Sequence, residues 1–532
     1  MKHPSQYLRE IHFLMKVKGE NSFRLNAYVR AAQVLSGKMD LLERAQKGLL
    51  IQIPGIGPHL ASILTEYLCE QSTRFKDQLE STIPPVLLEW AKLPGIGPQK
   101  AWQLQNELGI HTLEELERAC QENQLCEKKG FGEKGQEKIL KTIEFLKANE
   151  GKFLLSEGLL YAENLLNCFK ETFPDLRIEP TGALRRKTEV LEKLEFLIEA
   201  PFSQQILDQL NQAHLTFSKI IPIQFYWARP EEFGYQWVQT TGSSRHWQVL
   251  GSPASLFKAS ETEFYQALGL PWIPPEARES GEEVELARQG KLNLVSSIRG
   301  IFHVHTNWSD GASSLEEVVQ AAQQMGFEYI GISDHSVSAF YAQGLHENVL
   351  LAQRQVLESI QLRYPHIRIF WGIESDILAD GSLDYPSHIL EQFDFVIAAI
   401  HSRFQMDCST MTQRILCALR NPYTRFLAHP TGRLLLKRPG YPVDLNMIIE
   451  EAASYGVAIE LNSDPSRLDF DWRFGKVFRA TSTLSSIHPD AHHVTALQNI
   501  QYGIAMAKKA LLPSSAVLNT RSVQDIQAWL KR

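Results

Sequence analysis

The sequence is poor in cysteine, in long apolar runs and in excess positive charge. Its 6 cysteines are scattered, which argues against a disulfide framework or a cysteine zinc site and favours reduced thiols in a cytoplasm. No apolar run reaches the length of a transmembrane helix and no apolar leader follows a basic start, so we expect a soluble protein without membrane contact. The net charge is -7, which argues against a broadly basic nucleic-acid binder, so any DNA contact must be local.

What the sequence does contain is histidine and aspartate in a pattern typical of metal ligands. Residues 301–335 read IFHVHTNWSDG, then a segment with helical periodicity, then FEYIGISDH. They supply His303, His305, Asp310 and His335, and imidazole with carboxylate suits zinc, manganese or iron. His303 and His305 alternate along an extended segment, so we expect both rings on one side. Taken alone, the pair would fit two exposed strand histidines equally well.

The pattern recurs through the C-terminal half, where apolar runs of strand length stop at polar residues. The stops are His335, Glu374, His401, His429, Asn462, and Asp490 with His492. They lie about 30 residues apart, the length of one strand-plus-helix unit in a parallel sheet. The connecting segments have helical periodicity. In 313–324, Ser313 and Glu316 predict a capping box before an apolar stripe.

Apolar strands separated by helices predict a sheet buried on both faces, and seven such units predict closure into an α/β barrel. In barrels, functional residues collect where the strands end. One rim should therefore gather His303, His305, Asp310, His335, Glu374, His401, His429, Asp490 and His492. These are too many for one ion, so we predict two or three divalent ions, Mn²⁺ before Zn²⁺ or Fe²⁺. The competing interpretation is that strand-end residues merely cap turns and helix starts.

These same segments resemble a known family. FHVHTNWSDG, ISDHS, GIESDILADGSLDY, AAIHSRF, NPYTRFLAHPTGRLL, IELNSDPSRLD and HPDAHH resemble the PHP (polymerase and histidinol phosphatase) domain, in the version fused to bacterial family X DNA polymerases. The resemblance covers residues 295–532 and implies a distorted seven-unit barrel, a metal-dependent phosphoesterase, whose ligands fall on the nine residues above. The family usually has aspartate where this chain has Ile301. That side chain would stand behind the ligands, so its loss should retune a metal without removing a donor.

Arginines near the expected rim are candidates to hold a phosphate. Arg433 follows His429 in HPTGR, and we predict that it orients a phosphate by a forked contact. A salt bridge at the rim is the alternative for Arg433 and for the weaker candidates Arg403 and Arg467. In the middle of the chain, Arg185, Arg186 and Arg245 could also contact phosphate, or be solvated surface residues.

Residues 1–150 contain a repeated glycine turn followed by an amphipathic segment. The copies are IPGIGPHLASIL at 53–64, LPGIGPQKAWQL at 93–104 and the looser KGFGEKGQEKIL at 129–140. They resemble helix-hairpin-helix motifs, whose N–H groups hold a DNA phosphate without reading bases. The expected contacts are Gly55, Gly57, Gly95, Gly97, Lys100, Gly130 and Gly132. The alternative is that G-x-G only makes a tight turn between helices. Relatives with deoxyribose-phosphate lyase activity have lysine where Ile63 stands, so no Schiff base and no lyase activity are predicted.

The middle region, 151–290, resembles the nucleotidyltransferase palm of family X polymerases without its metal-binding residues. In TGALRRKTEVLEKLEFLIEA, two aspartates of the family fall on Lys193 and Glu195, and the third falls on Gln224. Polymerisation needs two magnesium ions held by anionic oxygens, and a lysine would place a cation there instead. We therefore predict a degenerate palm without polymerase activity. The proline-rich, acidic segment 273–290 is expected to connect it to the barrel.

Together these features predict three domains, 1–150, 151–290 and 295–532, of a metal-dependent phosphoesterase that acts on DNA in repair. The expected reaction is 3'-5' exonuclease cleavage, cleavage at an abasic site, or both. Two alternatives remain open: a small-molecule phosphatase of the histidinol phosphatase type, and a non-catalytic DNA-binding scaffold with structural metals. The lost aspartates argue against an active repair polymerase.

Overall fold

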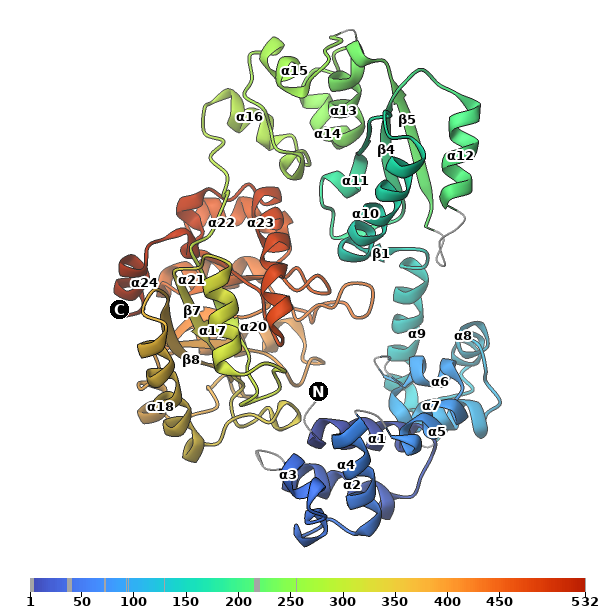
Figure 1. Cartoon of the computed structure of the whole chain (residues 1–532), viewed down its shortest axis with the longest axis vertical. Helices are drawn as coiled ribbons and strands as arrows, with labels where there is room; N and C mark the ends of the chain where they lie inside the picture. The colour runs from blue at the N-terminus through green and yellow to red at the C-terminus, as the bar shows by residue number, and fades with distance from the viewer. Residues whose placement is uncertain are drawn as a thin grey trace. The chain divides into compact units, whose positions relative to one another are not determined.

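The computed structural model describes residues 4–35, 41–70, 73–91, 93, 95–128, 130–214, 221–254 and 256–531. The chain forms two compact units, Met1–Glu150 and Gly151–Arg532 (Figure 1). Within these ranges, no helix combines the length and apolar character needed to cross a membrane. Pro94 and Lys129, which belong to the second and third glycine turns, lie outside the described residues.

The first unit is helical, as the sequence predicted. Its elements are α1 (Pro4–Val17), α2 (Ser22–Leu35), α3 (Leu41–Gln46), η1 (Leu50–Gln52), α4 (Pro58–Glu70), α5 (Arg74–Thr82), α6 (Pro85–Trp90), α7 (Gly97–Asn106), α8 (Leu113–Gln121) and α9 (Gly132–Ala148). One apolar core joins them, with Leu8, Leu64, Leu104 and Ile139 fully buried. Helices α4, α7 and α9 each follow one of the three glycine turns.

The second unit begins with a mixed α/β region. Its elements are β1 (Phe153–Leu154), α10 (Leu155–Thr172), β2 (Ile178–Pro180), α11 (Gly182–Arg185), β3 (Val190–Leu191), β4 (Leu194–Glu199), α12 (Gln204–His214), β5 (Ile223–Ala228), η2 (Pro230–Glu232), α13 (Phe233–Thr241), α14 (Ser244–Val249), α15 (Glu261–Ala267), η3 (Pro275–Ala277) and α16 (Glu282–Arg288). Strand β4 pairs antiparallel with β2 and parallel with β5.

A buried ion cluster ties the end of this region to its beginning. Glu261 accepts two hydrogen bonds from Arg278, at 2.6 and 3.0 Å, and two from Arg185, at 2.7 and 2.9 Å. Arg186 donates from Nε to Glu279 at 2.9 Å. The segment 273–290 is therefore more than a connector, because Arg278 and Ile273 are completely buried within the region. Arg185 and Arg186 fit neither predicted alternative, contact with phosphate or a solvated surface position, since both side chains are mostly buried and paired internally.

The rest of the second unit is a nearly closed parallel barrel, which confirms the predicted fold. The strands are β6 (Gly300–Val304), β7 (Tyr329–Ile332), β8 (Arg368–Asp376), β9 (Phe395–Ala399), β10 (Thr424–Leu427), β11 (Ala458–Asn462) and β12 (Ser485–His488). They neighbour one another in chain order in a 7-stranded sheet. A bridge between Val304 and Ala491 joins the two edges, so no long strand edge is left open.

Helices connect the strands and surround the barrel (Figure 1). The elements are α17 (Leu315–Gln324), η4 (Phe340–Ala342), α18 (Glu347–Arg363), α19 (Ser387–Leu390), α20 (Cys408–Leu419), α21 (Leu445–Tyr455), η5 (Trp472–Phe474), α22 (Gly475–Thr481), η6 (Val494–Asn499), α23 (Ile500–Lys509), η7 (Ser514–Ala516), η8 (Leu518–Thr520) and α24 (Val523–Leu530). The capping box of α17 is Ser314 with Glu317, one residue later than predicted. Ser313 instead accepts a hydrogen bond from the N–H of Val494 at 3.2 Å.

Aromatic side chains fill the barrel interior. The ring centroid of Phe302 lies 5.0 Å from that of Phe395 and 4.9 Å from that of Phe426. Trp529 of α24 lies 5.4 Å from Phe426. The barrel is therefore a packed support rather than a pore, and polar side chains are left for the end of the strands.

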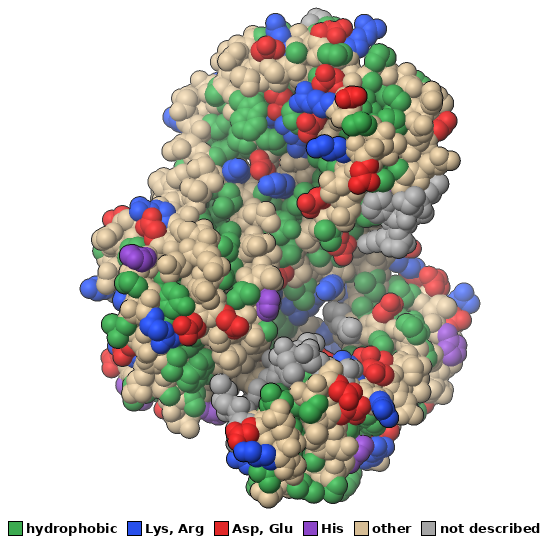
Figure 2. Space-filling model, viewed as in Figure 1, with side chains coloured by type: hydrophobic (Ala, Val, Ile, Leu, Met, Phe, Trp, Pro, Cys, Tyr) green, Lys and Arg blue, Asp and Glu red, His purple; other side chains and the backbone are tan. Residues whose placement is uncertain are grey.

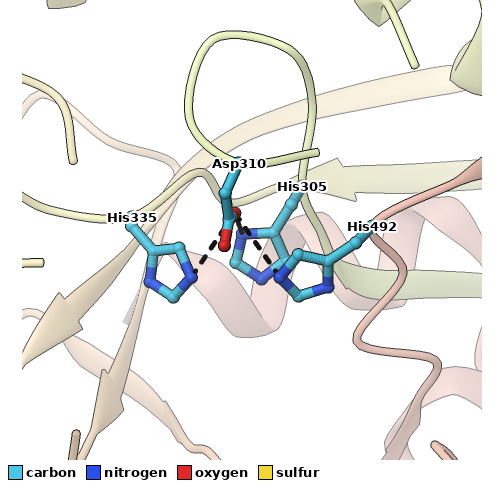
Figure 3. Close-up of side chains that lie close together, drawn as sticks. All are labelled: His305, Asp310, His335 and His492. Atoms are coloured by element: carbon cyan, nitrogen blue, oxygen red, sulfur yellow. Dashed lines mark ion pairs between the residues drawn. The ribbon is translucent and has the colours of Figure 1, made fainter. Parts of the chain in front are cut away.

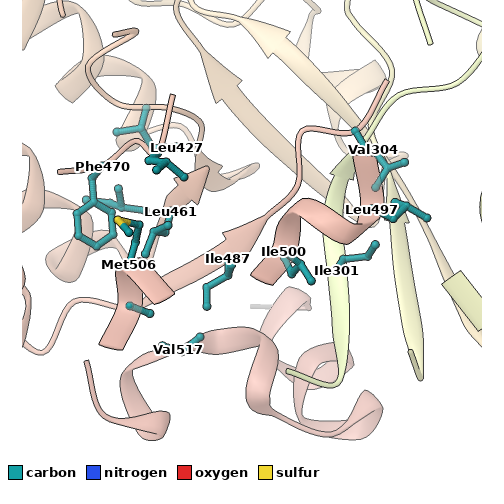
Figure 4. Close-up of a cluster of buried hydrophobic side chains, with 14 of the residues drawn as sticks. Ile301, Val304, Leu427, Leu461, Phe470, Ile487, Leu497, Ile500, Met506 and Val517 are labelled. Atoms are coloured by element: carbon teal, nitrogen blue, oxygen red, sulfur yellow. The ribbon is translucent and has the colours of Figure 1, made fainter. Parts of the chain in front are cut away.

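A bulge in β6 makes two consecutive residues, Phe302 and His303, face the interior. His303 has φ 59°, and the pairing with β7 shifts between Ile301 and Val304. The expectation that the rings of His303 and His305 lie on one side is confirmed, since their centroids are 5.2 Å apart and both approach Asp490. The bulge, rather than simple alternation along the strand, brings them together. Ile301 does not stand behind the donors, since it packs outside the barrel near Leu497 and Ile500 (Figure 4).

The buried Glu261 cluster predicts a pH-dependent contribution to stability. Burial alone would raise the pKa of Glu261, but Arg278 and Arg185 lower it from 4.5 to about 2. A lowered pKa in the folded state stabilises above pH 4.5, and this contribution is lost as the pH falls from 4.5 towards 2. Glu261→Gln should therefore lower the free energy of unfolding by about 3 kcal/mol at pH 7.

Urea unfolding followed by tryptophan fluorescence would measure this change. The difference from the unmodified protein should shrink below pH 4.5. Glu285→Gln, at an exposed ion pair with Arg288, is the matched control and should change stability by less than about 0.5 kcal/mol. An equal effect of the two substitutions would contradict the role of the cluster.

Candidate metal centre

The structure brings the nine predicted donors together at the carboxyl ends of the barrel strands. His303 and His305 lie at the end of β6, Glu374 on β8, and the others in the segments that directly follow β6, β7, β9, β10 and β12. Parallel strands of a closed barrel all end at one rim, so residues up to 189 positions apart in sequence become neighbours.

Glu374 is the hub of the cluster. Its Oε1 lies 3.2 Å from Nε2 of His303, 3.3 Å from Nε2 of His401 and 3.2 Å from Nε2 of His429. Its Oε2 lies 2.9 Å from Nδ1 of His335 and 3.5 Å from Nε2 of His305. One buried carboxylate thus faces two sets of imidazoles through its two oxygens, which is the geometry expected of a bridging ligand.

Two further carboxylates complete the centre. Oδ1 of Asp310 lies 3.4 Å from Nε2 of His492 and 3.7 Å from Nε2 of His335, on the side of the cluster shown in Figure 3. Oδ1 of Asp490 lies 3.4 Å from Nε2 of His303 and 3.3 Å from Nε2 of His305. Each acid is therefore surrounded by histidines from other strands.

The nine residues form overlapping groups that could each hold a metal ion. The groups are His305, Asp310, His335 and His492; His303, His305 and Asp490; His303, Glu374 and His429; and His335, Glu374 and His401, with ligand atoms within 4.8 Å of one another in each group. Because the groups share members, they fit adjacent ions in one pocket better than separate, independent sites.

Buried donor atoms that lie near opposite charge but make no hydrogen bond support the fit of the set to divalent ions. Among the residues that the structure describes, these side-chain atoms make no hydrogen bond: His303 Nε2, His305 Nδ1 and Nε2, His335 Nδ1, His429 Nδ1 and Glu374 Oε2. A buried polar atom without a partner is costly. Nitrogen and carboxylate oxygen are the donors that zinc, manganese and iron accept.

The electrostatics keep the acids ionised. Burial would raise the pKa of Glu374, but His303, His335 and His401 hold it well below its ordinary value. The pKa of Asp490 is likewise held well below its usual range, against the effect of burial, by His303 and His305. Burial and the neighbouring His492 and His335 lower the pKa of His305 to about 4, so this imidazole is neutral, as a metal ligand must be.

Buried residues behind the donors fix their orientation, and the sequence analysis missed them. Glu460 places Oε1 2.5 Å from Nδ1 of His303 and accepts the N–H of His429 through Oε2. Asp376 lies 2.6 Å from Nδ1 of His401. Such carboxylates hold a ligating imidazole in one tautomer and orientation. The sequence did carry one signal for Glu460, an acidic residue inside the apolar strand VAIELN. A carboxylate at such a position is rarely buried unless it has a partner.

The backbone at three of the donors is in the left-handed region. The φ angles are 59° at His303, 24° at His429 and 49° at Asp490. This conformation is costly for residues other than glycine and tends to persist where the surrounding structure enforces it, often at functional sites. Here the Glu460 contacts to His303 and His429 and the Asn462 amide, 3.0 Å from Asp490 Oδ2, supply that constraint.

Comparison with known proteins agrees with the geometry. The PHP domain profile matches residues 302–438, a helix-hairpin-helix domain matches 2–73, and a SAM-like helix-hairpin-helix tandem matches 87–144. The chain is 31% identical over 99% of its length to the DNA polymerase/3'-5' exonuclease PolX of Bacillus subtilis, covering 98% of that protein. The chain belongs to the bacterial PolX family.

Other relatives align along nearly their whole length with less than half of this chain. A probable phosphatase of Caldanaerobacter subterraneus is 27% identical over 45% of this chain and 92% of its own length. A probable phosphatase of Thermoanaerobacter pseudethanolicus is 27% identical over 43% of this chain and 93% of its own length. Together with the PHP match, this gives the C-terminal region of this PolX chain a metal-dependent phosphoesterase role.

Arg433, the predicted phosphate contact, is already engaged. Its Nε donates to the carbonyl of Arg467 at 2.9 Å, Nη1 to Asp471 at 2.9 Å, and Nη2 to the carbonyl of Leu468. The predicted forked contact between Arg433 and a phosphate is therefore wrong. The structure shows the alternative, a salt bridge, which here holds a loop in place. That loop presents Arg467, whose Nε lies 3.6 Å from Asp490 Oδ2.

The three positions of this PolX chain at which the resemblance to a polymerase palm would place aspartates lie close together. Glu195 and Gln224 are register partners on β4 and β5. Nζ of Lys193 lies 3.2 Å from Oε1 of Glu195, and the hydroxyl of Tyr226 donates to the same oxygen at 2.9 Å. Gln224 donates its amide to the carbonyl of Phe225 at 3.1 Å. The ammonium of Lys193 thus pairs with the carboxylate of Glu195.

The three glycine turns share one geometry. In each, the residue between the two glycines, Ile56, Ile96 or Phe131, is buried and donates its N–H to the carbonyl three residues earlier, at 3.0, 3.2 and 3.1 Å. The preceding glycines, Gly55, Gly95 and Gly130, have φ 88°, 93° and 94°, which only glycine adopts at low cost. Gly97 and Gly132 also have positive φ, at 67° and 62°, whereas Gly57 is not among these residues.

The turns differ in what lies around them. Gly55 and Gly57 of the first turn are exposed. Lys100, a predicted DNA contact, donates to the carbonyl of Gly95 at 3.1 Å and lies 5.2 Å from the ring centroid of Phe131. Its ammonium therefore bridges the second and third turns, and its contact with DNA stays a prediction. On the face drawn in Figure 2, Lys and Arg lie among Asp and Glu rather than in one continuous patch.

Replacing Glu374 should strongly weaken metal binding at the centre. We expect Glu374→Gln to weaken it by at least about 100-fold, because the substitution removes the charge of a proposed ligand. Even the loss of a residue that only supports a ligand weakens metal binding by about 10- to 100-fold. The metal content per chain, measured by inductively coupled plasma mass spectrometry after Mn²⁺ loading and gel filtration, should fall accordingly.

Added Mn²⁺ should raise the unfolding temperature of the unmodified protein and not that of the variant, because only a bound ligand stabilises the folded state. Glu391→Gln, an exposed acid beyond α19, is the control and should bind as the unmodified protein does. Equal metal content in the two variants would remove Glu374 from the set of ligands.

Proposed function

We propose that this protein is a metal-dependent 3'-5' exonuclease that acts on DNA during repair and that has lost polymerase activity. Three regions divide the work: 1–150 holds the DNA backbone, 151–290 is a degenerate palm, and 295–532 cleaves. The observation that carries the proposal is the set of nine donors around Glu374, joined in one chain to two helix-hairpin-helix regions. The PolX relative named as a 3'-5' exonuclease supports the reaction.

The nine residues are proposed to hold two or three divalent ions, with Mn²⁺ preferred over Zn²⁺ and Fe²⁺. When bound, such ions supply Lewis acidity, which activates water near neutral pH and neutralises charge on phosphoryl oxygens. Glu374 and Asp490 provide the negative charge that holds the ions, while Glu460 and Asp376 keep His303 and His401 in orientation. No side chain needs to act as a nucleophile.

Arg467 is proposed to contact the phosphate. Its side chain is mostly buried beside Asp490, and Arg433 holds the carbonyls of Arg467 and Leu468 so that the guanidinium stays at the rim. Burial would lower the pKa of Arg467, but Asp490, Asp469 and Asp464 raise it, so the charge is retained. A guanidinium held in this way suits a phosphate oxygen through charge-assisted hydrogen bonds.

The loss of polymerisation is inferred from charge. A two-magnesium site needs clustered carboxylates, but the palm offers Glu195, an amide at Gln224 and the cation of Lys193 at 3.2 Å from Glu195. A small-molecule phosphatase is the second candidate, because the shorter relatives that match the barrel are named probable phosphatases. The helix-hairpin-helix regions argue for DNA as the substrate. An enzyme that hydrolyses a small soluble phosphomonoester does not need to hold a DNA backbone.

Labelled oligonucleotides separate these functions. With Mn²⁺, the protein should shorten a single strand and a gapped duplex from the 3' end and should not extend a primer when nucleotides are added. The double variant Asp490→Ala His492→Ala should lose more than about 100-fold in rate, because two donors are removed. His493→Ala, an adjacent exposed histidine outside the centre, should retain the rate.

The same experiment also tests an abasic duplex and histidinol phosphate as substrates. Primer extension would overturn the interpretation of the palm. Hydrolysis of histidinol phosphate with no cleavage of DNA would favour the phosphatase, and shortening that persists in the double variant would indicate a contaminating nuclease.

Arg467→Ala should lower kcat/KM for the oligonucleotide by about 100-fold while the metal content stays unchanged, because the substitution removes a phosphate contact and no ligand. Steady-state kinetics together with metal analysis would measure both quantities. Arg363→Ala, at an exposed ion pair with Glu316, is the control. A parallel fall in metal content would show that Arg467 supports the centre instead of the substrate.

A further inference from the structure

Two aromatic side chains stand exposed beside the metal centre. Phe340 and Tyr341 form the start of η4, in the loop that follows β7, and are 79% and 51% exposed. Their ring centroids lie 6.3 Å apart at an interplanar angle of 77°. A single exposed ring needs no explanation, but two adjacent large rings at a catalytic rim are unusual, because exposed apolar area tends to be used for binding.

Tyr341 lies directly against the donors. Its ring centroid is 6.1 Å from that of His335 and 6.3 Å from that of His401, nearly edge-on to both. Phe340 is the more exposed neighbour. The pair therefore extends from the donors outward to solvent.

The loop that carries the two rings is firmly anchored. Ser338 donates its N–H to Asp384 Oδ2 at 2.6 Å, and the hydroxyl of Tyr385 donates to the carbonyl of Leu345. Ala339 and Ala342, on either side of the rings, are completely buried or nearly so. Gly344 packs so closely on the carbonyl of Ser336 that a Cβ would lie 1.8 Å from it. Burial of the flanking residues thus holds the rings at the surface.

Positive charge also lies at the rim. Arg467 follows β11, and its Nε lies 3.6 Å from Oδ2 of Asp490, one of the donors. The rim therefore offers both a guanidinium and an aromatic pair beside the donors. A phosphodiester held there would place its phosphate towards Arg467 and its nucleobase towards the rings.

We propose that Phe340 and Tyr341 form a stacking subsite for the nucleobase at the 3' end of the strand, next to the phosphodiester to be cleaved. The inference rests on the proposed exonuclease function and specifies its substrate: an unpaired 3' nucleotide of any sequence. Base stacking on aromatic rings tolerates every base because each has a π face. A base paired in a duplex cannot enter such a subsite without first leaving its partner.

Phe340→Ala tests the subsite without touching the donors, because the side chain is largely exposed. It should lower kcat/KM about tenfold for a single strand that ends in a normal 3' nucleotide. The same strand with a 3'-terminal abasic residue should be cleaved by both proteins at rates within about twofold of each other, since it has no base to stack. Phe340→Trp should restore the rate, and Leu362→Ala, 84% exposed on α18, should not change it.

A binding measurement gives a second readout that does not depend on turnover. A strand with 2-aminopurine at its 3' end would be titrated with protein in Ca²⁺ in place of Mn²⁺. Stacking quenches the fluorescence of this base, so the unmodified protein and Phe340→Trp should quench it, and Phe340→Ala should quench it much less.

The outcomes separate this subsite from the nuclease itself. Cleavage of DNA by the unmodified protein, with equal rates and equal quenching in Phe340→Ala, would overturn the subsite and leave the exonuclease intact. No cleavage of any strand by the unmodified protein would overturn the exonuclease. Quenching lost only in Phe340→Ala would then still support the stacking subsite.

Discussion

The carboxylate of Glu374 is the constraint on which the functional region depends. An ionised acid buried inside a barrel is strongly unfavourable unless opposite charge and donors surround it. Five histidines from β6, β7, β9 and β10 meet its two oxygens within 3.5 Å. Their convergence is possible only if every strand ends at the same height around a closed circle. The stability of the rim and its capacity for metal thus follow from one packing arrangement.

The layers beneath and behind this carboxylate keep its partners in place. The aromatic rings of Phe302, Phe395 and Phe426 fill the interior and keep the strands at a fixed separation. Glu460 then holds both His303 and the backbone of His429, whose φ angles lie in the left-handed region. Apolar packing therefore keeps the strands rigid, and buried carboxylates fix the orientation of the donor side chains. A site assembled from strand ends needs both, because each donor arrives from a different part of the chain.

Buried charges are also paired in the middle region, but there they pair with one another and form no group of candidate metal ligands among the nine predicted donors. Its arginines are paired within the protein, most completely where Arg185 and Arg278 enclose Glu261. The acid Glu195 is paired with Lys193. These charges satisfy one another within the region, so its fold gains internal ion pairs. The donors of the barrel rim instead converge on Glu374.

The sequence by itself determined the seven strand-and-helix units, the nine donors and the three glycine turns, because each rests on local periodicity or on a residue type at a strand end. Tertiary structure alone decided how the bulge at His303 directs both Phe302 and His303 inward and turns Ile301 outward. It also engaged Arg433 within the protein and brought Arg467 beside Asp490, and it placed Glu460 behind two donors. These outcomes depend on register, on backbone conformation and on which charge lies across a barrel, and contacts between distant strands set all three.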